Sequence, residues 1–282
     1  MTTGHMTYTG MCSVDGTNLL CSSMSSSIDQ KVLFFDHIMG LKDTFSNSGT
    51  STGVSKKSSS STNSTQKKIY RYSPAIAKAS ISGPVPDRGF QSIVNAAING
   101  SDISVTLVFW ASGAANVTLT EAKISNLTIT LKAGDIAQYS MEIVSGKYSN
   151  GVTSSSPVNC QKLLTWDTCT VDSDISDDDI ESFSVTINNP VIPIYTTKWT
   201  NDAETGGMMP QKLRIGIQEV SGSIGVYGNP TIDQNAGSIT FGLNSFSKTI
   251  KVVYVQPKDE GNSGIYIKHV SFYGVNDGAI WS

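Results

Sequence analysis

The chain has 282 residues, enough for one large domain or two smaller ones with real cores. Charged residues make up 15% of the chain and the net charge is −3, which excludes a bulk electrostatic attraction to nucleic acid. The N-terminus lacks a signal-peptide pattern, and the chain has no apolar run of the roughly 18 residues that a membrane helix needs. We therefore expect a protein without a membrane partner that is made and folded in a cytoplasm.

The N-terminal part combines strand-like sequence with one unusual segment. Apolar patches between polar residues predict strands across residues 13–41, with a helix as the alternative for 31–41. Residues 44–68 are mostly Ser and Thr and cannot bury enough surface to fold alone. We expect a long loop, either disordered or ordered against a neighbouring subunit. Its basic residues are Lys56, Lys57, Lys67 and Lys68.

Residues 87–99 are predicted to form a helix, because their apolar residues recur at helical spacing. The stripe consists of Phe90, Ile93, Val94, Ala97 and Ile98. Asp87 is the expected N-cap, and Gly100 is the expected stop. The stripe should pack on a sheet.

The remainder of the chain is predicted to be strands. Runs of β-branched and aromatic residues are separated by Gly, Asn, Pro and Asp, which favours short strands joined by turns. The runs are 102–110, 116–131, 182–187, 213–220, 238–243, 250–255 and 265–273. This pattern indicates an all-β protein with one peripheral helix, an antiparallel barrel or sandwich, and not a parallel α/β sheet.

Two segments of the sequence recur faintly. Residues 17–30 are similar to 125–138, and residues 80–85 are similar to 186–191 at nearly the same shift. Their common order indicates a tandem duplication, although Ser- and Thr-rich strands can also resemble one another by chance. On the duplication reading, a first β-domain spans 1–115, with the 44–68 loop and the helix, and a second spans 116–282.

An acidic run follows in the second half. It resembles a calcium loop but lacks the glycine and glutamate that such a loop needs, so we expect no metal site. The run is either a solvated turn or a partner for the basic loop of another copy, where pairing would provide register. Its acidic residues are Asp172, Asp174, Asp177, Asp178, Asp179 and Glu181.

The sequence offers little chemistry. The three histidines lack metal-ligand spacing, and neither a nucleophile elbow nor a phosphate-binding loop is present. The cysteines, at positions 12, 21, 160 and 169, lack zinc spacing and are expected to be thiols, with disulfides formed after release from the cell as the alternative. We therefore predict no enzyme and no cofactor. The alternative to a structural role is a glycan- or surface-binding β-protein, with exposed tryptophans as stacking platforms; core packing is the other reading of those tryptophans.

Part of the chain resembles a known family. Residues 181–189, 210–216 and 219–224, preceded by 123–129, are similar to the tail tube (major tail) proteins of long-tailed bacteriophages. The resemblance covers residues 116–228 directly. It implies antiparallel β-barrels that form rings of six, stacked into a hollow tube through which the genome passes into the host. The protein would then be a structural subunit of the virion tail, assembled in the host cytoplasm.

The family resemblance also implies partners and contacts. The main partner would be the chain itself, with the sheath, tail terminator, baseplate and tape measure proteins as further partners and DNA passing without specific binding. Long loops bridge rings in this family, so the lysines of 44–68 are candidates for that contact. The acidic residues of 172–181 would line the lumen or face a neighbouring ring. Two barrels per chain predict a trimer with pseudo-sixfold symmetry, and one barrel predicts a hexamer. Chain length does not decide between them, but single-barrel members of the family are usually shorter, so the resemblance leans to the trimer.

Overall fold

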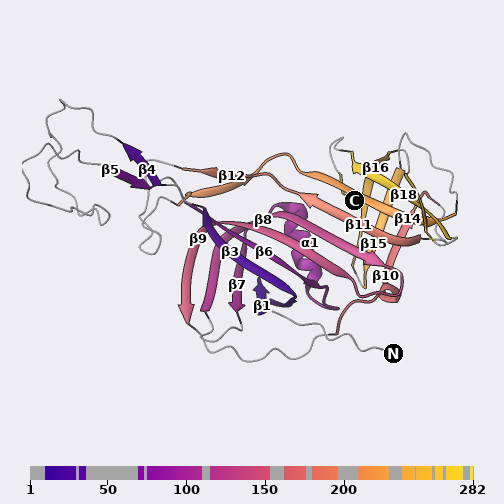
Figure 1. Ribbon diagram of the computed structural model, residues 1–282, viewed down its shortest axis with the longest axis horizontal. Coiled ribbons are helices and arrows are strands. Elements are labelled where there is room, and N and C mark those ends of the chain that lie inside the picture. Colours follow the sequence, from indigo (N-terminus) through magenta and orange to yellow (C-terminus); the bar gives the residue numbers. More distant parts are fainter. Residues whose placement is uncertain are drawn as a thin grey trace, which may run out of the picture.

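A computed structural model of the chain shows an antiparallel all-β protein with one peripheral α-helix, as the sequence predicts (Figure 1). The structure describes residues 10–29, 32–35, 69–72, 75–109, 115–152, 162–175, 180–195, 209–228, 237–244, 246–255, 258–262, 265–275 and 280–281.

The elements before residue 160 comprise nine strands and the helix, counted over the described residues. They are β1 (Gly10–Val14), β2 (Thr17–Cys21), β3 (Ser23–Asp29), β4 (Val32–Phe35), β5 (Ile69–Tyr72), β6 (Ile76–Pro84), α1 (Phe90–Asn99), β7 (Ile103–Phe109), β8 (Ala115–Lys132) and β9 (Gln138–Val152).

The later elements are strands and one short 3-10 turn, again over the described residues. They are η1 (Trp166–Thr168), β10 (Cys169–Ser173), β11 (Ile180–Asn188), β12 (Val191–Ile194), β13 (Lys212–Ile215), β14 (Glu219–Tyr227), β15 (Gly237–Leu243), β16 (Phe246–Tyr254), β17 (Lys258–Asn262) and β18 (Ile265–Gly274).

One path of eight strands organises the molecule. Its spatial order is β3-β6-β9-β8-β11-β14-β18-β17, every neighbouring pair being antiparallel. We call β3, β6, β9 and β8 the first set, and β11, β14, β18 and β17 the second set. In each set the strands follow the chain in the order first, second, fourth, third. A two-stranded ribbon follows the first strand of each set, β4–β5 in one and β12–β13 in the other.

The repeated strand order and the faint sequence repeat involve different strands. Residues 17–30 cover β2 and β3, whereas 125–138 cover the end of β8 and the first residue of β9. The predicted division at residue 115 falls on the first residue of β8, a strand of the first set. Strands on both sides of that residue pair in one sheet, and the division stays a prediction.

Strand β8 joins the two sets because it changes its neighbour. Residues 116–122 pair with β7, and residues 126–132 pair with β11. The register shifts between Ile124 and Asn126, where the backbone N–H of Asn189 donates to the Ser125 carbonyl at 2.8 Å. The irregularity at Ser125 therefore marks the place along β8 after which it pairs with β11, the first strand of the second set.

The first set encloses a core with β1, β2, β7 and α1. Strand β2 returns against β6, where the Ser22 N–H donates to the Ser82 carbonyl at 2.8 Å. A Cβ on Gly83 would lie 2.2 Å from the Leu20 carbonyl oxygen, so this close approach requires glycine. Phe90, Ile93, Val94 and Ala97 of α1 are buried, which confirms that the helix packs its stripe on the sheet.

The structure corrects two local predictions. The helix begins at Phe90 after Gly89 (φ 82°), and Asp87 is not its cap; the Asp87 Oδ1 atom accepts from Asn244 Nδ2 at 2.8 Å. Its end at Gly100 (φ 60°) is as predicted. The predicted strand 213–220 is two strands, β13 and β14, because the backbone leaves the sheet between them and Gly216 N–H donates to the Pro190 carbonyl.

The second set has a more aromatic core. The Phe183 ring lies 5.8 Å from the Phe241 ring and 6.1 Å from the Phe272 ring, and the Trp281 ring meets Phe241 edge-on at 6.4 Å. Strands β10, β15 and β16 complete this half of the molecule (Figure 1).

The helix prediction for 31–41 is not supported at Val32–Phe35, which form β4; the later residues of that range lie outside the described part.

Candidate assembly surfaces

The eight-strand path has one face of small polar side chains. Alternation along each strand turns the apolar residues inward, for example Ile81, Ile129 and Val185, and turns hydroxyls and amides outward. We call this surface the hydroxyl face. It carries Ser23, Ser25, Ser27, Ser80, Ser82, Ser140, Asn126, Thr128, Thr130, Ser182, Ser184, Thr186, Asn188, Ser221, Ser223 and Ser271.

Charges on the hydroxyl face are few. Lys78 Nζ pairs with Asp29 Oδ2 at 2.6 Å, and the Asn188 side-chain amide donates to Glu219 Oε2 at 3.2 Å. Across the junction of the sets, the Thr128 and Thr186 hydroxyls lie 2.9 Å apart. The face is therefore mostly hydroxyls and amides with few charges, so a passing polyanion would meet no basic array on it.

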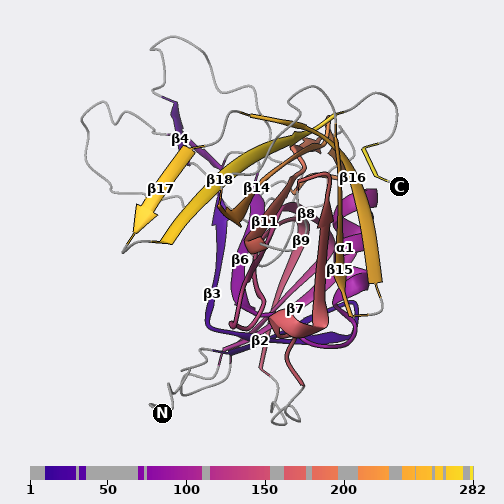
Figure 2. The ribbon, with the colours of Figure 1, turned by 90° about the vertical axis from the view of Figure 1, so that its right-hand side faces the viewer.

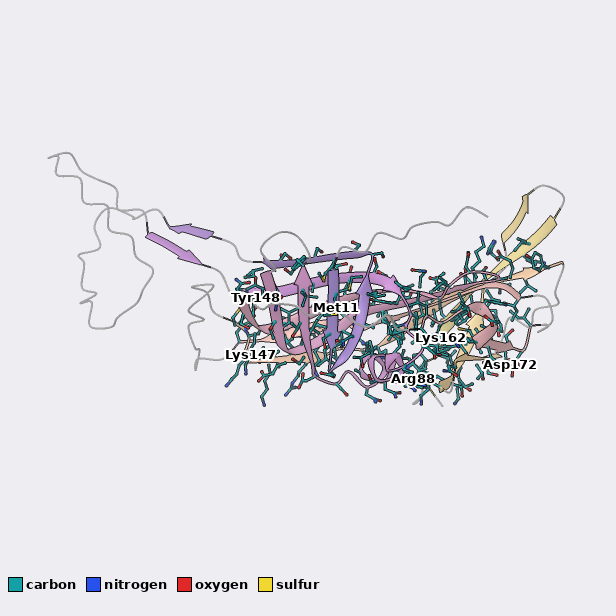
Figure 3. The ribbon with its side chains drawn as sticks, turned by 90° about the horizontal axis from the view of Figure 1, so that it is seen from below. Met11, Arg88, Lys147, Tyr148, Lys162 and Asp172 are labelled. Atoms are coloured by element: carbon teal, nitrogen blue, oxygen red, sulfur yellow. The ribbon has the colours of Figure 1, made fainter. Side chains whose placement is uncertain are left out.

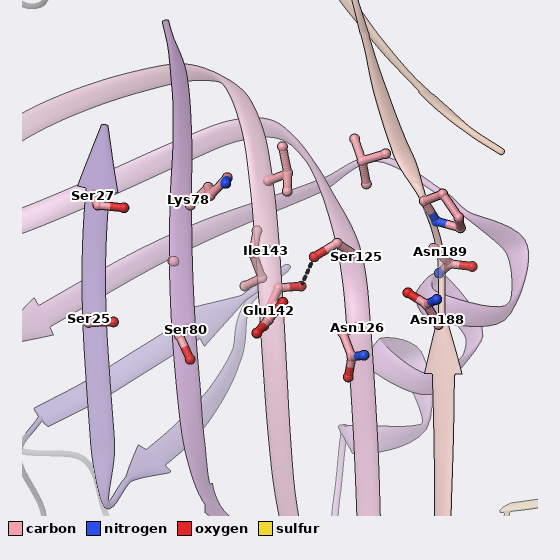
Figure 4. A pocket seen from close by; sticks show the side chains of 14 residues that line it. Ser25, Ser27, Lys78, Ser80, Ser125, Asn126, Glu142, Ile143, Asn188 and Asn189 are labelled. Atoms are coloured by element: carbon pink, nitrogen blue, oxygen red, sulfur yellow. Dashed lines mark hydrogen bonds between the residues drawn. The ribbon is translucent and has the colours of Figure 1, made fainter. Parts of the chain in front are cut away.

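A groove of about 530 Å³ opens on this face where the two sets meet (Figure 4). Its walls are strands β3, β6, β9 and β8 on one side and the segment from Asn188 to Val191 on the other. Inside it, the Ser125 hydroxyl donates to the Glu142 carbonyl at 3.1 Å. The groove lies beneath the start of β12, and Val144 on its floor is buried.

A buried polar cluster fastens the second set to the helix of the first. The Asn189 amide, 1% exposed, donates to the carbonyls of Ala97 at 2.8 Å and Ile124 at 3.1 Å. Gln218 Nε2 donates to Asn189 Oδ1 at 2.8 Å and to the Ile98 carbonyl at 3.0 Å. Helix C-termini leave carbonyls without helical partners, and residues of the second half supply partners here.

Lys123 completes the cap of α1. Its ammonium group donates to the Gly100 carbonyl at 2.6 Å and pairs with Asp102 Oδ1 at 2.9 Å. A cation at a helix C-terminus is stabilised by the helix dipole. The C-terminal end of α1 is thus held from two directions, by β8 and by the segments that flank the β12–β13 ribbon.

The two ribbons are placed differently. The β12–β13 ribbon lies on the first set, where β13 contacts β8 and β9 and a Cβ on Gly146 would lie 3.1 Å from the Pro210 carbonyl oxygen. The β4–β5 ribbon extends away from both sets (Figure 1).

An uncovered cluster of large apolar residues lies where β18 of the second set pairs with β16. Tyr273, Val253 and Val255 are 59%, 36% and 41% exposed. Val253 pairs with Tyr273, and the Val255 N–H donates to the Ser271 carbonyl, so the three residues are neighbours. We call them the apolar patch.

Two strands of the path have open edges. Among the described residues, β3 pairs with β6 alone and β17 with β18 alone (Figure 2). The exposed and half-buried residues of β3 alternate over seven positions, and no proline or lysine interrupts them. Such an edge is a template for pairing with another chain.

The structure describes three of the six predicted acidic residues, Asp172, Asp174 and Glu181. Asp172 is exposed on β10, at the opposite end of the molecule from Lys147 and Tyr148 (Figure 3). Asp174 Oδ2 accepts from the Ser238 N–H at 2.6 Å, and Glu181, 8% exposed, pairs with Lys132 at 3.7 Å. Asp177, Asp178 and Asp179, like Lys56, Lys57, Lys67 and Lys68, lie outside the described residues.

The sequence reasoning missed Asn189, Gln218 and Tyr273. The period-two spacing of Ser and Thr in β3, β6 and β11 was the available signal for the hydroxyl face. Trp166 and Trp281 pack partly buried against the core, Trp281 donating to Gln218 Oε1 at 2.7 Å, which is the packing reading of these side chains; Trp110 and Trp199 are outside the described residues.

The cysteines of the first half are buried thiols. Burial raises the pKa of Cys21 to about 11 and raises that of Cys12. Burial also raises the pKa of Cys169 to about 11, although this side chain is only half-buried. Cys160 is outside the described residues. Within the described part, no group of His, Cys, Asp and Glu is arranged to hold a metal ion, and no helix is long and apolar enough to cross a membrane.

Comparison with known proteins now connects these surfaces to a family. No curated protein matches the chain. The family model described as phage tail tube protein matches residues 18–266, which include all eight strands of the path except the end of β18. The chain therefore belongs to the phage tail tube protein family and is a structural subunit of the virion tail.

Proposed function

We propose that copies of this tube subunit close into a ring by pairing β17 of one copy with β3 of the next. The observation that carries the proposal is the repeated strand order with an open edge at each end. Within the chain, β8 ends the first set and pairs with β11, which begins the second. Strand β17 has the same place in its set as β8, and β3 has the same place as β11. The internal junction is thus a template for the junction between copies.

The chemistry of the two first strands supports this equivalence. Strand β11 presents Ser182, Ser184 and Thr186 to the hydroxyl face, and β3 presents serines at the same alternate spacing, positions 23, 25 and 27. Backbone pairing at a sheet edge supplies affinity, while alternate side chains fix the register. A copy that adds its β3 would therefore continue the hydroxyl face without a break in its chemistry.

The same equivalence bears on symmetry. If each chain supplies two sets, three chains give a ring of six sets, a trimer with pseudo-sixfold symmetry. Head-to-tail contacts close into rings when the rotation allows it, and a single-set subunit would need six copies. We propose the trimer, stacked through the lysine-rich 44–68 segment, with assembly in the host cytoplasm and a purely structural, non-enzymatic role beside the other tail proteins.

We propose further that the hydroxyl face lines the conduit. It is the continuous surface of the path, and its few charges would let DNA pass without binding. Asp172 lies on β10, a strand outside the path, so we assign the acidic residues of 172–179 to a contact with a neighbouring copy rather than to the lumen. A partner for them would be the basic 44–68 segment. Glu181 is nearly buried on β11 and pairs with Lys132 of the same chain.

Proline substitution on β3 tests the ring. Neighbouring residues of a strand point their N–H groups to opposite sides, and proline removes the N–H group. Of Ser25→Pro and Ser26→Pro, one variant therefore loses a hydrogen bond to β6 and the other loses a donor on the open edge. Both variants should fail to form rings in end-on electron micrographs and analytical ultracentrifugation, and one of them should keep the thermal stability of the native monomer. Ser25→Ala, which keeps the N–H, should assemble normally. Rings from both proline variants would rule out pairing through β3, and six equal copies per ring would rule out the trimer.

A further inference from the structure

We infer that the β4–β5 ribbon of one copy covers the apolar patch on the neighbouring copy in the same ring. The patch is Val253, Val255 and Tyr273, and the occupant is the segment pair Val32–Phe35 and Ile69–Tyr72 of a second copy of this chain. The inference rests on the proposed ring, because it uses the equivalence of the β8–β11 and β17–β3 junctions.

The contact already exists once inside the chain. The β12–β13 ribbon, which follows β11, crosses the junction and lies on the preceding set. Val144 of that set points to the hydroxyl face opposite Lys78, yet it is only 9% exposed. Val144 and Val191 line the same groove, so the start of this ribbon covers the floor on which Val144 lies.

The second set has a counterpart of Val144 that no ribbon among the described residues covers. Val144 pairs with Lys78, the third residue of β6, and Tyr273 pairs with Ser221, the third residue of β14. Strands β6 and β14 hold the same place in their sets. Tyr273 is nevertheless 59% exposed, with Val253 and Val255 beside it. A covering ribbon is therefore present over the first set and missing over the second in an isolated copy.

The β4–β5 ribbon has the right attachment to supply this cover. Two residues separate β3 from β4, and two residues separate β11 from β12. When β3 of a neighbouring copy pairs with β17, its ribbon starts beside the second set as β12 starts beside the first.

The composition of the β4–β5 ribbon points the same way. Its strands read Val-Leu-Phe-Phe and Ile-Tyr-Arg-Tyr, with Arg71 as the single charged residue. An isolated two-stranded ribbon is marginally stable in water, and its sequence needs an apolar surface to lie on. The apolar patch is a contiguous surface of large apolar side chains, and such surfaces commonly mark interaction sites.

A cross-link between two variants tests the contact. The background carries Cys160→Ser and Cys169→Ser, which leaves the buried Cys12 and Cys21. Because successive side chains of a strand alternate in direction, chains with Leu33→Cys and chains with Phe34→Cys are each mixed with Tyr273→Cys chains, assembled and oxidised. One of the two mixtures should give covalent dimers on a non-reducing gel. Ile217→Cys, at a site 75% exposed between β13 and β14, replaces Tyr273→Cys in the control mixtures and should give none.

The outcomes separate this inference from the ring. If tubes form but neither Tyr273→Cys mixture gives covalent dimers, the proposed docking of the ribbon is wrong and the ring proposal is unaffected. The same holds if the Ile217→Cys mixtures give as much covalent dimer as the Tyr273→Cys mixtures. Absence of rings from the unmodified protein would overturn both. As a second measurement, Tyr273→Ser should raise the concentration for half-assembly about tenfold or more, since a buried aromatic side chain is lost from the contact, while Ile217→Ser should not. An unchanged assembly concentration for Tyr273→Ser would contradict the inference.

Discussion

The first and second sets have the same strand order but differ in what completes them. The first set has α1 and the β12–β13 ribbon laid on it by its own chain, and its Val144 is buried. The second set has no such cover among the described residues, and its Tyr273 is exposed. This difference is the observation behind the proposed contact, in which another copy supplies to the second set the cover that the chain supplies to the first.

The two halves also have different cores. The first is aliphatic, with Phe90 and Tyr139 as its one aromatic pair among the described contacts, at 5.4 Å. The second is built around Phe183, Phe241 and Phe272. We therefore expect the stability of the second half to depend more heavily on a few large aromatic rings than that of the first half.

Phe183→Ala should have the largest effect on stability, and it tests whether the aromatic rings stabilise the core of the second half. The ring is 1% exposed and touches two other rings, so its removal leaves a cavity that the sheet cannot close. We expect a loss of about 3–5 kcal/mol in the free energy of unfolding, measured with denaturant. The neighbouring Ser184→Ala, on the hydroxyl face, should change it by less than about 0.5 kcal/mol. A small effect of Phe183→Ala would mean that the rings do not support the second core.

Asn189→Ala should have the next largest effect and act on the junction of the two sets. The change removes donors to the Ala97 and Ile124 carbonyls and the acceptor of Gln218, all within the buried cluster. Unpaired buried polar groups cost about 1–3 kcal/mol each, and we expect a loss of about 2–3 kcal/mol.

The control for Asn189 is its neighbour. Asn188→Ala removes a surface bond to Glu219 and should cost less than about 0.5 kcal/mol in the same denaturant experiment. Equal losses for the two asparagines would show that the cluster does not hold the sets together.

Sequence reasoning reached the fold class and the family but not the assembly surfaces. The alternation of apolar residues in β8 and β11 and the stripe of α1 are local signals, and they predicted the elements well. The break at Gly216 was missed because apolar residues continue on both sides of it; what ends β13 is the bond from Gly216 to the Pro190 carbonyl, a contact distant in sequence.

The pairing of strands distant in the chain was likewise not predictable. The repeat of strand order needs the pairings of β8 with β11 and of β9 with β6, whereas the faint sequence repeat linked other strands. Asn189 looked like a turn residue at the end of a strand, and its role depends on the Ala97 carbonyl of α1, 92 residues away in the chain. Side chains that act across such distances have no periodic signal in the sequence.

Alkaline pH should produce the smallest effect and should distinguish the buried cysteine of the first half from the half-exposed one of the second. The pKa of Cys21 is raised from 9.0 to about 11, mainly by burial; Tyr139, whose hydroxyl lies 3.8 Å from the Cys21 sulfur, and Cys12 also face it. The unfolded thiol loses its proton near pH 9 while the folded thiol keeps it. Stability from this group is therefore complete below pH 9 and falls as the pH rises from 9 to 11.

The measurement compares unfolding by denaturant at pH 8 and pH 10. For Cys21→Ala the decrease in the free energy of unfolding between these pH values should be smaller than for the native protein by about 1 kcal/mol. Cys169→Ala should change the decrease less, because the half-exposed Cys169 thiolate is partly solvated in the folded state and ionisation there costs less. An equal pH dependence for Cys21→Ala and the native protein would mean that water reaches the Cys21 thiol. The core of the first half would then be less tightly enclosed than the close approach of Gly83 to the Leu20 carbonyl implies.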